Sequence, residues 1–306
     1  MTPRPRFVAA MAAVLVAVVA CAAPAPTPSN ASAPTASGTS KPSVLPVLVS
    51  SELSVGPNRY LFSFVEATAN TPVAAPDRTA SVQFTGPANQ AIPATPATFI
   101  WAIENVSGIY VTNVDFPAAG DWIAHFATAG AGKPEERIDF QFQVAAKKNV
   151  ISPGDKAPSV ATPTLAAVGG DVSKISSDAK PDKAFYETSV ADALAAHKPF
   201  VLIFATPKFC QTSTCGPTLD KVKPIAAAHP NLTFINVEPY VLADDQGQLQ
   251  PVLDTKGNLQ AVPATIAYGL VSEPYVFVVG GDGIVKASFE LIFTPDEIDK
   301  ALAGLT

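Results

Sequence analysis

The most regular alternation of apolar and polar residues lies at positions 138–144, where Ile, Phe, Phe and Val alternate with Asp and two Gln. A period of two residues is typical of a β-strand with one buried face. Similar segments, separated by clusters of Pro, Gly and Asn, occupy residues 59–65, 80–84, 109–116 and 121–126. Because no helical period lies between them, residues 46–146 are predicted to form an all-β sandwich.

The stretch from Ile109 to Trp122 contains a strand, a corner with Pro117 and Gly120, and a second strand that begins near the tryptophan. This pattern resembles the immunoglobulin-like domains of bacterial envelope proteins. The resemblance covers about 100 residues and implies an immunoglobulin-like fold, but it implies no activity.

Beyond residue 182 the pattern changes to alternating helical and extended segments. Residues 200–204 are continuously apolar, as in a strand buried on both faces. Further strands are predicted at 232–237, 275–279 and 284–289, and helices at 189–197 (capped by Thr188), 216–228, 262–268 and from Thr294 onward. Residues 280–283, Gly-Gly-Asp-Gly, predict a hairpin turn, and the polar residues 247–260 predict an irregular insertion. Residues 183–306 are therefore predicted to form an α/β domain.

The N-terminus has the pattern of an export signal. Arg4 and Arg6 precede an apolar run at 7–20, which is shorter than the roughly 20 residues that span a bilayer. Small or β-branched residues come directly before Cys21, which resembles the lipobox of bacterial lipoproteins. The resemblance implies a signal peptide over residues 1–21 and acylation of Cys21.

The alternative is a secreted protein cleaved near Ala20 or Ala23. Residues 22–45, almost entirely Ala, Pro, Ser and Thr, predict a disordered tether, and the Pro-rich residues 147–182 predict a second linker. The expected location is the extracytoplasmic face of the cell membrane, with lipid as the anchor.

The net charge excludes one class of partner. The formal charge is −6, and removal of residues 1–20 takes away Arg4 and Arg6 and brings it to −8. We expect no nucleic-acid partner, since such proteins carry basic surfaces.

The chain has three cysteines. With Cys21 used by lipid, Cys210 and Cys215 remain as a pair, which in an oxidising compartment is expected to act as a stable or cycling disulfide. They lie directly after the apolar run at 200–204 and directly before a predicted helix. A thiol at a helix N-terminus is favoured as thiolate, the form that attacks disulfides.

Pro274 comes directly before the predicted strand at 275–279. Cysteines between a strand and a helix, followed downstream by such a proline, resemble the thioredoxin superfamily over the whole C-terminal domain. More narrowly, the chain resembles lipoproteins that couple a β-sandwich to a thioredoxin-like domain. The resemblance implies that Pro274 is a cis-proline packed against the cysteines.

The motif departs from the thioredoxin pattern, because four residues separate the cysteines instead of two. Either Cys210 is the nucleophile and Cys215 resolves it, or Cys215 occupies the usual frame and Thr218 replaces the resolving cysteine. Five helical steps would point the cysteine side chains about 140° apart, so residues 211–214 must form a turn. Phe209 holds the place of the thioredoxin tryptophan, and residues 200–204 lack the buried acid of thioredoxins.

Three other interpretations stay open. In the first, the pair is a structural disulfide in a non-enzymatic binding or assembly lipoprotein. The motif also resembles copper-delivering thioredoxin-like proteins, but their downstream histidine has no counterpart after His229. Thr212 and Cys215 match part of the peroxiredoxin pattern, with Pro207 displaced by one position.

We predict a thiol-disulfide oxidoreductase that acts on thiols or disulfides of exported proteins, together with an electron-transfer partner. In this hypothesis Cys210 forms the mixed disulfide, Cys215 resolves it and Pro274 orients the substrate chain. No cofactor and no metal are expected. The acidic residues Glu238, Asp244 and Asp245 lack calcium-loop spacing and are expected to be solvated.

Overall fold

The computed structural model describes residues 35–36 and 41–305. These residues belong to one compact unit. The predicted signal peptide, Cys21 and most of the tether at 22–45 lie outside the described residues. Within the described part, no helix has both the length and the apolar character needed to cross a membrane.

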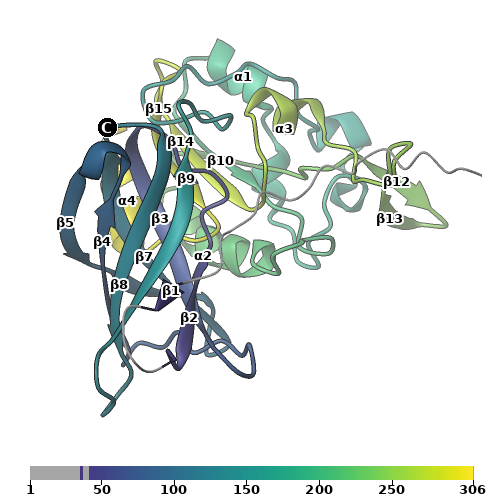
Figure 1. Ribbon diagram of the computed structural model, residues 1–306. Coiled ribbons are helices and arrows are strands. Elements are labelled where there is room, and N and C mark those ends of the chain that lie inside the picture. Colours follow the sequence, from purple (N-terminus) through teal and green to yellow (C-terminus); the bar gives the residue numbers. More distant parts are fainter. Residues whose placement is uncertain (1–34, 37–40, 306) are drawn as a thin grey trace, which may run out of the picture. The chain divides into compact units, whose positions relative to one another are not determined.

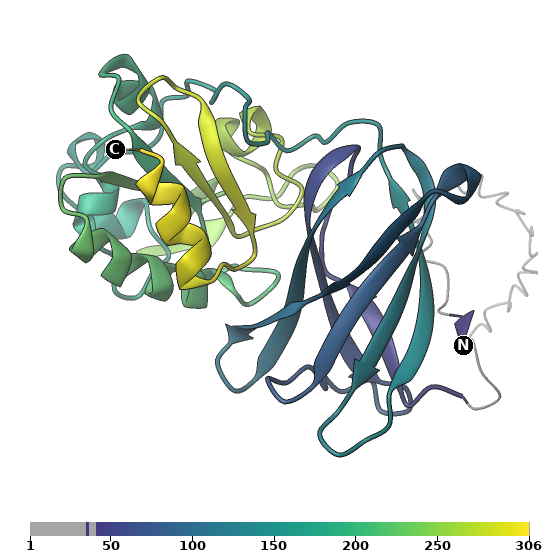
Figure 2. The ribbon, with the colours of Figure 1, turned by 90° about the vertical axis from the view of Figure 1, so that its left-hand side faces the viewer.

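The first part of the chain forms two antiparallel sheets (Figures 1 and 2). One sheet has the strand order β2 (Val44–Leu48), β3 (Gly56–Glu66), β7 (Ser107–Phe116) and β6 (Thr98–Ile103). The other has the order β1 (Thr35–Ala36), β9 (Glu136–Val144), β8 (Gly120–Ala129), β4 (Thr79–Thr85) and β5 (Ala91–Pro96). A short 3-10 helix, η1 (Pro87–Asn89), lies between β4 and β5.

Aromatic side chains from both sheets build the core between them. Tyr60 of β3 meets Phe84 of β4 edge to face at 5.0 Å between ring centroids, and Phe62 lies 4.8 Å from Phe126 of β8. Trp122 is fully buried, and its indole N–H donates to the Ala118 carbonyl at 3.0 Å. Such rings supply most of the buried apolar area of a small core. Two sheets around one core confirm the predicted β-sandwich at the level of its layers.

All five strands predicted for this part are present, each longer than predicted by two to four residues. Four others, β1, β2, β5 and β6, were not predicted. β5 contains two prolines and is an edge strand, where a missing N–H is tolerated. β2 begins at Val44, two residues before the predicted boundary at 46, and β1 pairs with β9 inside the predicted tether.

The segment predicted as a linker at 147–182 is packed rather than free. Val150 and Ala157 are buried in one core of the C-terminal part, and Val172 is buried in another. Its regular structure consists of short 3-10 helices, η2 (Ala166–Val168) and η3 (Val172–Lys174), and η4 (Lys183–Tyr186) follows it. Single turns leave no period in the sequence, so the composition alone suggested a linker.

A mixed four-stranded sheet organises the C-terminal part. Its order is β11 (Thr233–Val237), β10 (Phe200–Phe204), β14 (Tyr275–Val279) and β15 (Val285–Glu290). β10 is parallel to β11 and antiparallel to β14, and β14 is antiparallel to β15. Every residue of β10 and β14 is buried, with alternate side chains in two separate cores. The continuous apolar runs therefore arise from burial of both faces.

Helices cover both faces of this sheet (Figure 2). The core that contains Val201 takes in α2 (Cys215–Ala228) and α4 (Pro295–Ala303). The core that contains Phe200 takes in α1 (Val190–Ala195) and α3 (Pro263–Ala267). The cap of α1 is Ser189, whose hydroxyl accepts the Asp192 N–H at 3.1 Å, and not the predicted Thr188.

The region around the predicted insertion at 247–260 contains a hairpin that was not predicted. β12 (Leu242–Asp245) pairs with β13 (Gln248–Pro251) as a separate two-stranded sheet. The turn residues Gln246 and Gly247 both have positive φ, as hairpin turns of this length require. The strands were not predicted because most of their side chains are exposed and none is buried.

Candidate functional site

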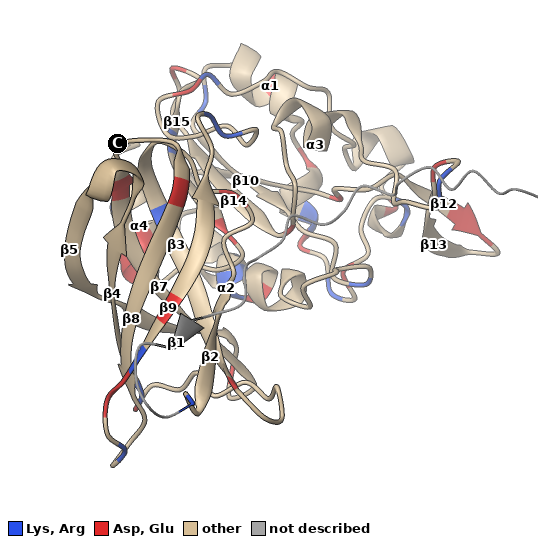
Figure 3. Cartoon of the chain, in the orientation of Figure 1, with Lys and Arg blue, Asp and Glu red and all other residues tan. Residues whose placement is uncertain are grey.

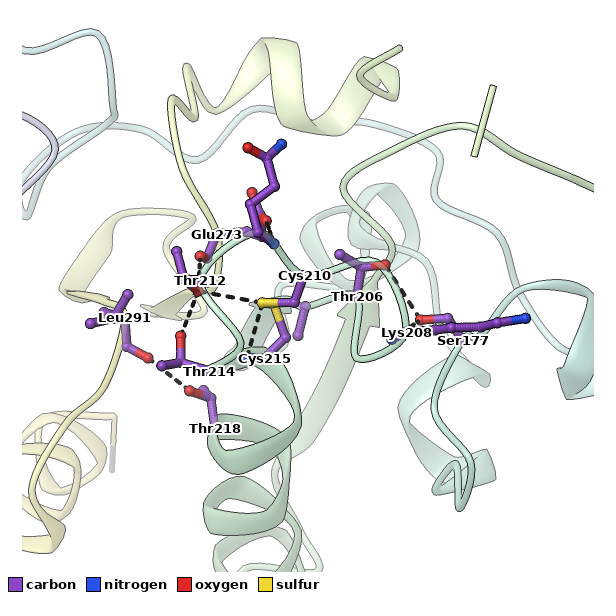
Figure 4. The surroundings of a disulfide bond; sticks show 12 residues. Ser177, Thr206, Lys208, Cys210, Thr212, Thr214, Cys215, Thr218, Glu273 and Leu291 are labelled. Atoms are coloured by element: carbon purple, nitrogen blue, oxygen red, sulfur yellow. Dashed lines mark hydrogen bonds between the residues drawn. A yellow bond between two sulfur atoms is a disulfide. The ribbon is translucent and has the colours of Figure 1, made fainter. Parts of the chain in front are cut away.

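The two cysteines predicted to pair are joined in the structure (Figure 4). The Cα atoms of Cys210 and Cys215 lie 6.0 Å apart, within the range that a disulfide requires. Residues 211–214 form no helix, and α2 begins at Cys215. The prediction that these four residues form a turn is confirmed. A turn is needed here because a helical segment would point the two sulfur atoms apart.

The N-terminus of α2 contacts the sulfur of Cys210. The backbone N–H of Cys215 donates to Cys210 Sγ at 3.2 Å. Thr214, the N-cap residue, makes no capping bond with its own side chain, so the sulfur takes the place of a capping oxygen. The free N–H groups and the dipole of the helix favour negative charge at this point. In the reduced protein they would stabilise a Cys210 thiolate.

The two sulfur atoms differ in their access to solvent. Cys215 is fully buried, at 0% exposure, and belongs to the core that also contains Leu219. Cys210 is partly exposed. A molecule that approaches from solvent can therefore reach the Cys210 sulfur first.

Threonine hydroxyls hold the loop between the cysteines. Thr212 Oγ1 lies 2.7 Å from Thr214 Oγ1 and 3.4 Å from Cys210 Sγ, and it donates to the Glu273 carbonyl at 2.9 Å. Ser213 has a φ of 62°, a left-handed conformation that a non-glycine residue adopts only in tight turns. These bonds fasten the loop to the segment that enters β14.

Glu273 is a buried carboxylate beside the disulfide, with 3% exposure. Its Oε1 accepts the Gln211 N–H at 2.8 Å and its Oε2 accepts the Tyr240 hydroxyl at 2.5 Å. A carboxylate oxygen of Glu273 and the sulfur atoms of Cys210 and Cys215 all lie within 4.8 Å of one another. This carboxylate therefore holds the cysteine loop in place and lies near the two sulfur atoms.

Tyr240 completes the contact. Gln211 Nε2 donates to its hydroxyl oxygen at 3.1 Å. Burial raises the pKa of the Tyr240 hydroxyl, and the hydrogen bond to Glu273 with the charge of that carboxylate raises it further. The tyrosine is therefore held as a neutral donor to the carboxylate.

Pro274 follows Glu273, and the peptide bond between them is cis. Pro274 is buried, and its carbonyl accepts the Leu291 N–H at 2.9 Å. Through the bonds of Glu273, the structure brings the segment that contains Pro274 against the loop of Cys210 and Cys215. The three predicted site residues thus lie in one region.

Thr218 lies within the first turn of α2. In one interpretation of the sequence, Cys215 is the nucleophile and Thr218 stands at the position of the resolving cysteine. Its side chain is buried, and its hydroxyl donates to the Leu291 carbonyl at 2.7 Å. This polar group is satisfied by the backbone, and the disulfide partner of Cys210 is Cys215. Cys210 with Cys215 is therefore the pair on which chemistry can be argued.

The acidic candidates separate in the structure. Asp244 and Asp245 lie exposed on β12, which with β13 forms a hairpin apart from the four-stranded sheet (Figure 3), as expected for solvated groups. Glu238, expected to be solvated with them, is instead buried, and its Oε1 accepts the Ser177 N–H at 2.5 Å. Burial raises the pKa of the Glu238 carboxyl. Within the described residues, these three acids do not gather into a group that could hold a cation.

Sequence reasoning missed Glu273 and Tyr240. The only signal for Glu273 is a charged residue directly before a proline and a buried strand, where a solvent-exposed side chain is the ordinary expectation. Tyr240 lies 33 residues earlier in a segment without a regular period. Neither residue could be assigned to the cysteines without the folded geometry.

We compared the sequence with protein-family models and with curated proteins. No protein-family model and no curated protein matches the chain. The function must therefore be argued from the disulfide at the start of α2 and from its buried carboxylate.

Proposed function

We propose that the chain is a lipid-anchored, extracytoplasmic thiol-disulfide oxidoreductase that acts on exported proteins through Cys210 and Cys215. One observation carries the proposal: the disulfide lies at the N-terminus of α2 with a partly exposed Cys210 and a fully buried Cys215. An inert staple has no need of this asymmetry. A nucleophile with a protected resolving partner requires it.

The sandwich and the α/β part are proposed to be immunoglobulin-like and thioredoxin-like. Support for the second comes from the mixed sheet with helices on both faces, and from a cysteine pair between β10 and α2. The position of Pro274 before β14 agrees with it. The sandwich would serve as a spacer or as a docking module for partners.

The proposed reaction exchanges one disulfide for another. The Cys210 thiolate attacks a substrate disulfide, forms a mixed disulfide and releases one substrate sulfur as thiolate. The Cys215 thiolate then attacks the Cys210 sulfur and releases the second substrate thiolate. The substrate gains two electrons and the pair returns to the disulfide. A dithiol protein partner must then reduce the pair, and the reverse sequence oxidises a substrate dithiol.

Glu273 acts in this scheme as a positioning residue. Its carboxylate accepts the Gln211 N–H, one residue after the nucleophile, and its backbone carbonyl accepts the Thr212 hydroxyl. Both hydrogen bonds join Glu273 to the loop between the two cysteines, whose disulfide must open and close in each reaction cycle. The Cys210 sulfur is therefore held at the helix N-terminus in a fixed orientation.

The reduction potential of the pair tests the proposal. The soluble chain that lacks residues 1–21 is equilibrated with glutathione or dithiothreitol, and the fraction of disulfide is measured by thiol trapping. We expect a value in the oxidoreductase range, roughly −120 to −270 mV. A value below about −300 mV would mark a structural staple in a binding or assembly lipoprotein.

A trapping experiment tests the two cysteine roles. With Cys215→Ala, the mixed disulfide on Cys210 cannot be resolved and should accumulate on exported proteins in the cell. The matched variant Cys210→Ala should trap little, because its remaining thiol is buried. Equal trapping by both variants would contradict the assigned roles.

A further inference from the structure

Within the described residues, only one group of side chains is suited to hold a metal ion, and it consists of Cys210, Cys215 and Glu273. Their ligand atoms lie within 4.8 Å of one another, and Cys215 and Glu273 are buried while Cys210 is partly exposed. The disulfide uses both sulfur atoms, so the group can serve a metal only after reduction.

We propose that the reduced pair binds one Zn²⁺ ion through Cys210 Sγ, Cys215 Sγ and a carboxylate oxygen of Glu273, with water as the fourth ligand. This inference rests on the proposed function in one respect only: the Cys210–Cys215 disulfide must be reducible to two thiols. It requires no exchange with another protein.

The dimensions of the group fit this ion. Zinc binds thiolate at about 2.3 Å and carboxylate at about 2.0 Å, so ligand atoms around a tetrahedral ion lie roughly 3.5–3.8 Å apart. Reduction lets the sulfur atoms of Cys210 and Cys215 separate to that distance. The carboxylate of Glu273 must approach by roughly 1.3 Å at most, since its oxygen starts within 4.8 Å.

Groups around the ligands are already in place. The Tyr240 hydroxyl and the Gln211 N–H hold the Glu273 carboxylate, and the Cys215 N–H donates to Cys210 Sγ. Each carboxylate oxygen has a second lone pair for a metal. Outer hydrogen bonds of this kind orient ligands and increase metal affinity. The N-terminus of α2 offsets the negative charge that remains when two thiolates and one carboxylate share a divalent ion.

The carboxylate selects among thiophilic metals. Cu(I) prefers soft sulfur ligands, whereas Zn²⁺ accepts sulfur and carboxylate oxygen in one site. The buried position of Glu273 beside two sulfur atoms therefore favours Zn²⁺.

The step balances as follows. An external dithiol transfers two electrons and two protons to the disulfide, which becomes two thiols, and the dithiol becomes oxidised. Zinc binds both sulfur atoms as thiolates, so relative to two thiols the zinc-bound pair has lost two protons. A Cys210 that is already thiolate has released its proton before zinc binds. The metal holds the pair in its reduced form.

The test uses the full chain with Cys21→Ser, purified from a reducing compartment under dithiothreitol and then freed of reductant without oxygen. Zinc chloride is titrated against a chromophoric competitor, and released protons are counted with a pH indicator. We expect one zinc per chain, and at most two protons released with it. The air-oxidised protein should bind none at this site.

Glu273→Gln should weaken zinc binding by at least about tenfold. Glu238→Gln is the matched control, because it alters a buried carboxylate outside the group and should leave zinc affinity unchanged. Circular dichroism of each variant shows that it is folded.

The proposal fails if the reduced chain does not bind zinc at micromolar concentration, or if Glu273→Gln binds as tightly as its parent. Both results are independent of the reduction potential, because the pair is never oxidised in this preparation. A reduction potential below about −300 mV would therefore reject the proposed oxidoreductase function but would not affect the result of the zinc titration.

Discussion

At the scale of single residues, Glu238 is the acid whose burial is least compensated. Its Oε1 accepts the Ser177 N–H, but its Oε2 makes no hydrogen bond among the described residues. Burial raises the pKa of the Glu238 carboxyl, and the nearby charge of Asp178 raises it further, although hydrogen bonds from Thr206 and Ser177 act against this. The folded state therefore binds this proton more tightly than the unfolded state does.

This difference predicts the direction of a pH effect. Below about pH 4.5 both states are protonated, and above it the unfolded state ionises first, so stability falls as pH rises. Glu238→Gln removes that loss. We expect it to raise the free energy of unfolding at pH 7 by about 1 kcal/mol relative to its effect at pH 4. Urea unfolding of both proteins at the two pH values measures this, and an identical effect at both would contradict the burial argument.

Glu273 shows what the sequence could and could not provide at this scale. The pairing of Cys210 with Cys215 followed from the count of three cysteines and from the resemblance of the segment before Cys21 to a lipobox. The turn between the paired cysteines followed from helix geometry. The contact of Glu273 with Gln211 joins residues 62 positions apart, and that with Tyr240 joins residues 33 apart. Such contacts depend on the arrangement of whole elements, which leaves no local pattern.

At the scale of elements, α4 is the helix whose start the sequence predicted most fully. Thr294 Oγ1 accepts the Glu297 N–H at 3.1 Å, and the Glu297 carboxylate accepts the Thr294 N–H at 2.8 Å. This reciprocal capping box follows directly from the residue types and their spacing. Its helix packs Ile298 and Leu302 into the core beside α2.

Thr294→Ala should therefore lower the free energy of unfolding by about 1 kcal/mol. The physical reason is the loss of the acceptor for the Glu297 N–H. Thr255→Ala, at an exposed position without a capping bond, is the control and should have almost no effect. Chemical unfolding followed by circular dichroism measures both variants, and equal stabilities would contradict the role of the cap.

The strands also divide into those that the sequence predicted and those that it did not. β9 was predicted because its apolar residues alternate against one core. β12 and β13 were not, because most of their side chains are exposed and none is buried. A hydrophobic pattern reports burial, so it misses strands that bury little. The packed turns of η2 and η3 were missed for the related reason that single turns have no period.

At the scale of the whole molecule, an ion pair joins β3 to α4. Arg59 donates to both oxygens of Glu297, at 2.6 Å from Nε and 3.0 Å from Nη2. The side chains are only 13% and 25% exposed. Burial alone would raise the pKa of the Glu297 carboxyl, but the hydrogen bond and charge of Arg59 outweigh it and hold the pKa below its usual value.

Arg59→Gln should lower the free energy of unfolding at pH 7 by about 2 kcal/mol. Because the pKa of Glu297 is lowered in the folded state, the contribution of the pair is complete above about pH 4.5 and is lost as pH falls further. The difference between variant and parent should therefore shrink at pH 3. Arg137→Gln breaks an exposed pair with Glu135 and should change stability little. A constant difference from pH 7 to pH 3 would exclude the ion pair as its cause.

The proposed anchor makes a prediction for the cell. Cys21→Ser removes the acylated sulfur, so the protein should move from the membrane fraction to the soluble exported fraction, without incorporated fatty acid. Cys210→Ser, which leaves the lipobox intact, should stay with the membrane. Fractionation with metabolic labelling measures both. Membrane retention of the Cys21→Ser protein would contradict lipid anchoring.

The position of the disulfide has one more consequence. Cys210 and Cys215 are five residues apart, so their bond closes a very small ring. In the chain-entropy model such a ring is worth about 2 kcal/mol, against about 4.7 for a loop of 100 residues. The aromatic and aliphatic cores, not this cross-link, hold the chain together. We therefore expect the oxidised and reduced forms to share one scaffold, with the reorganisation on reduction of this bond confined to a few residues of backbone.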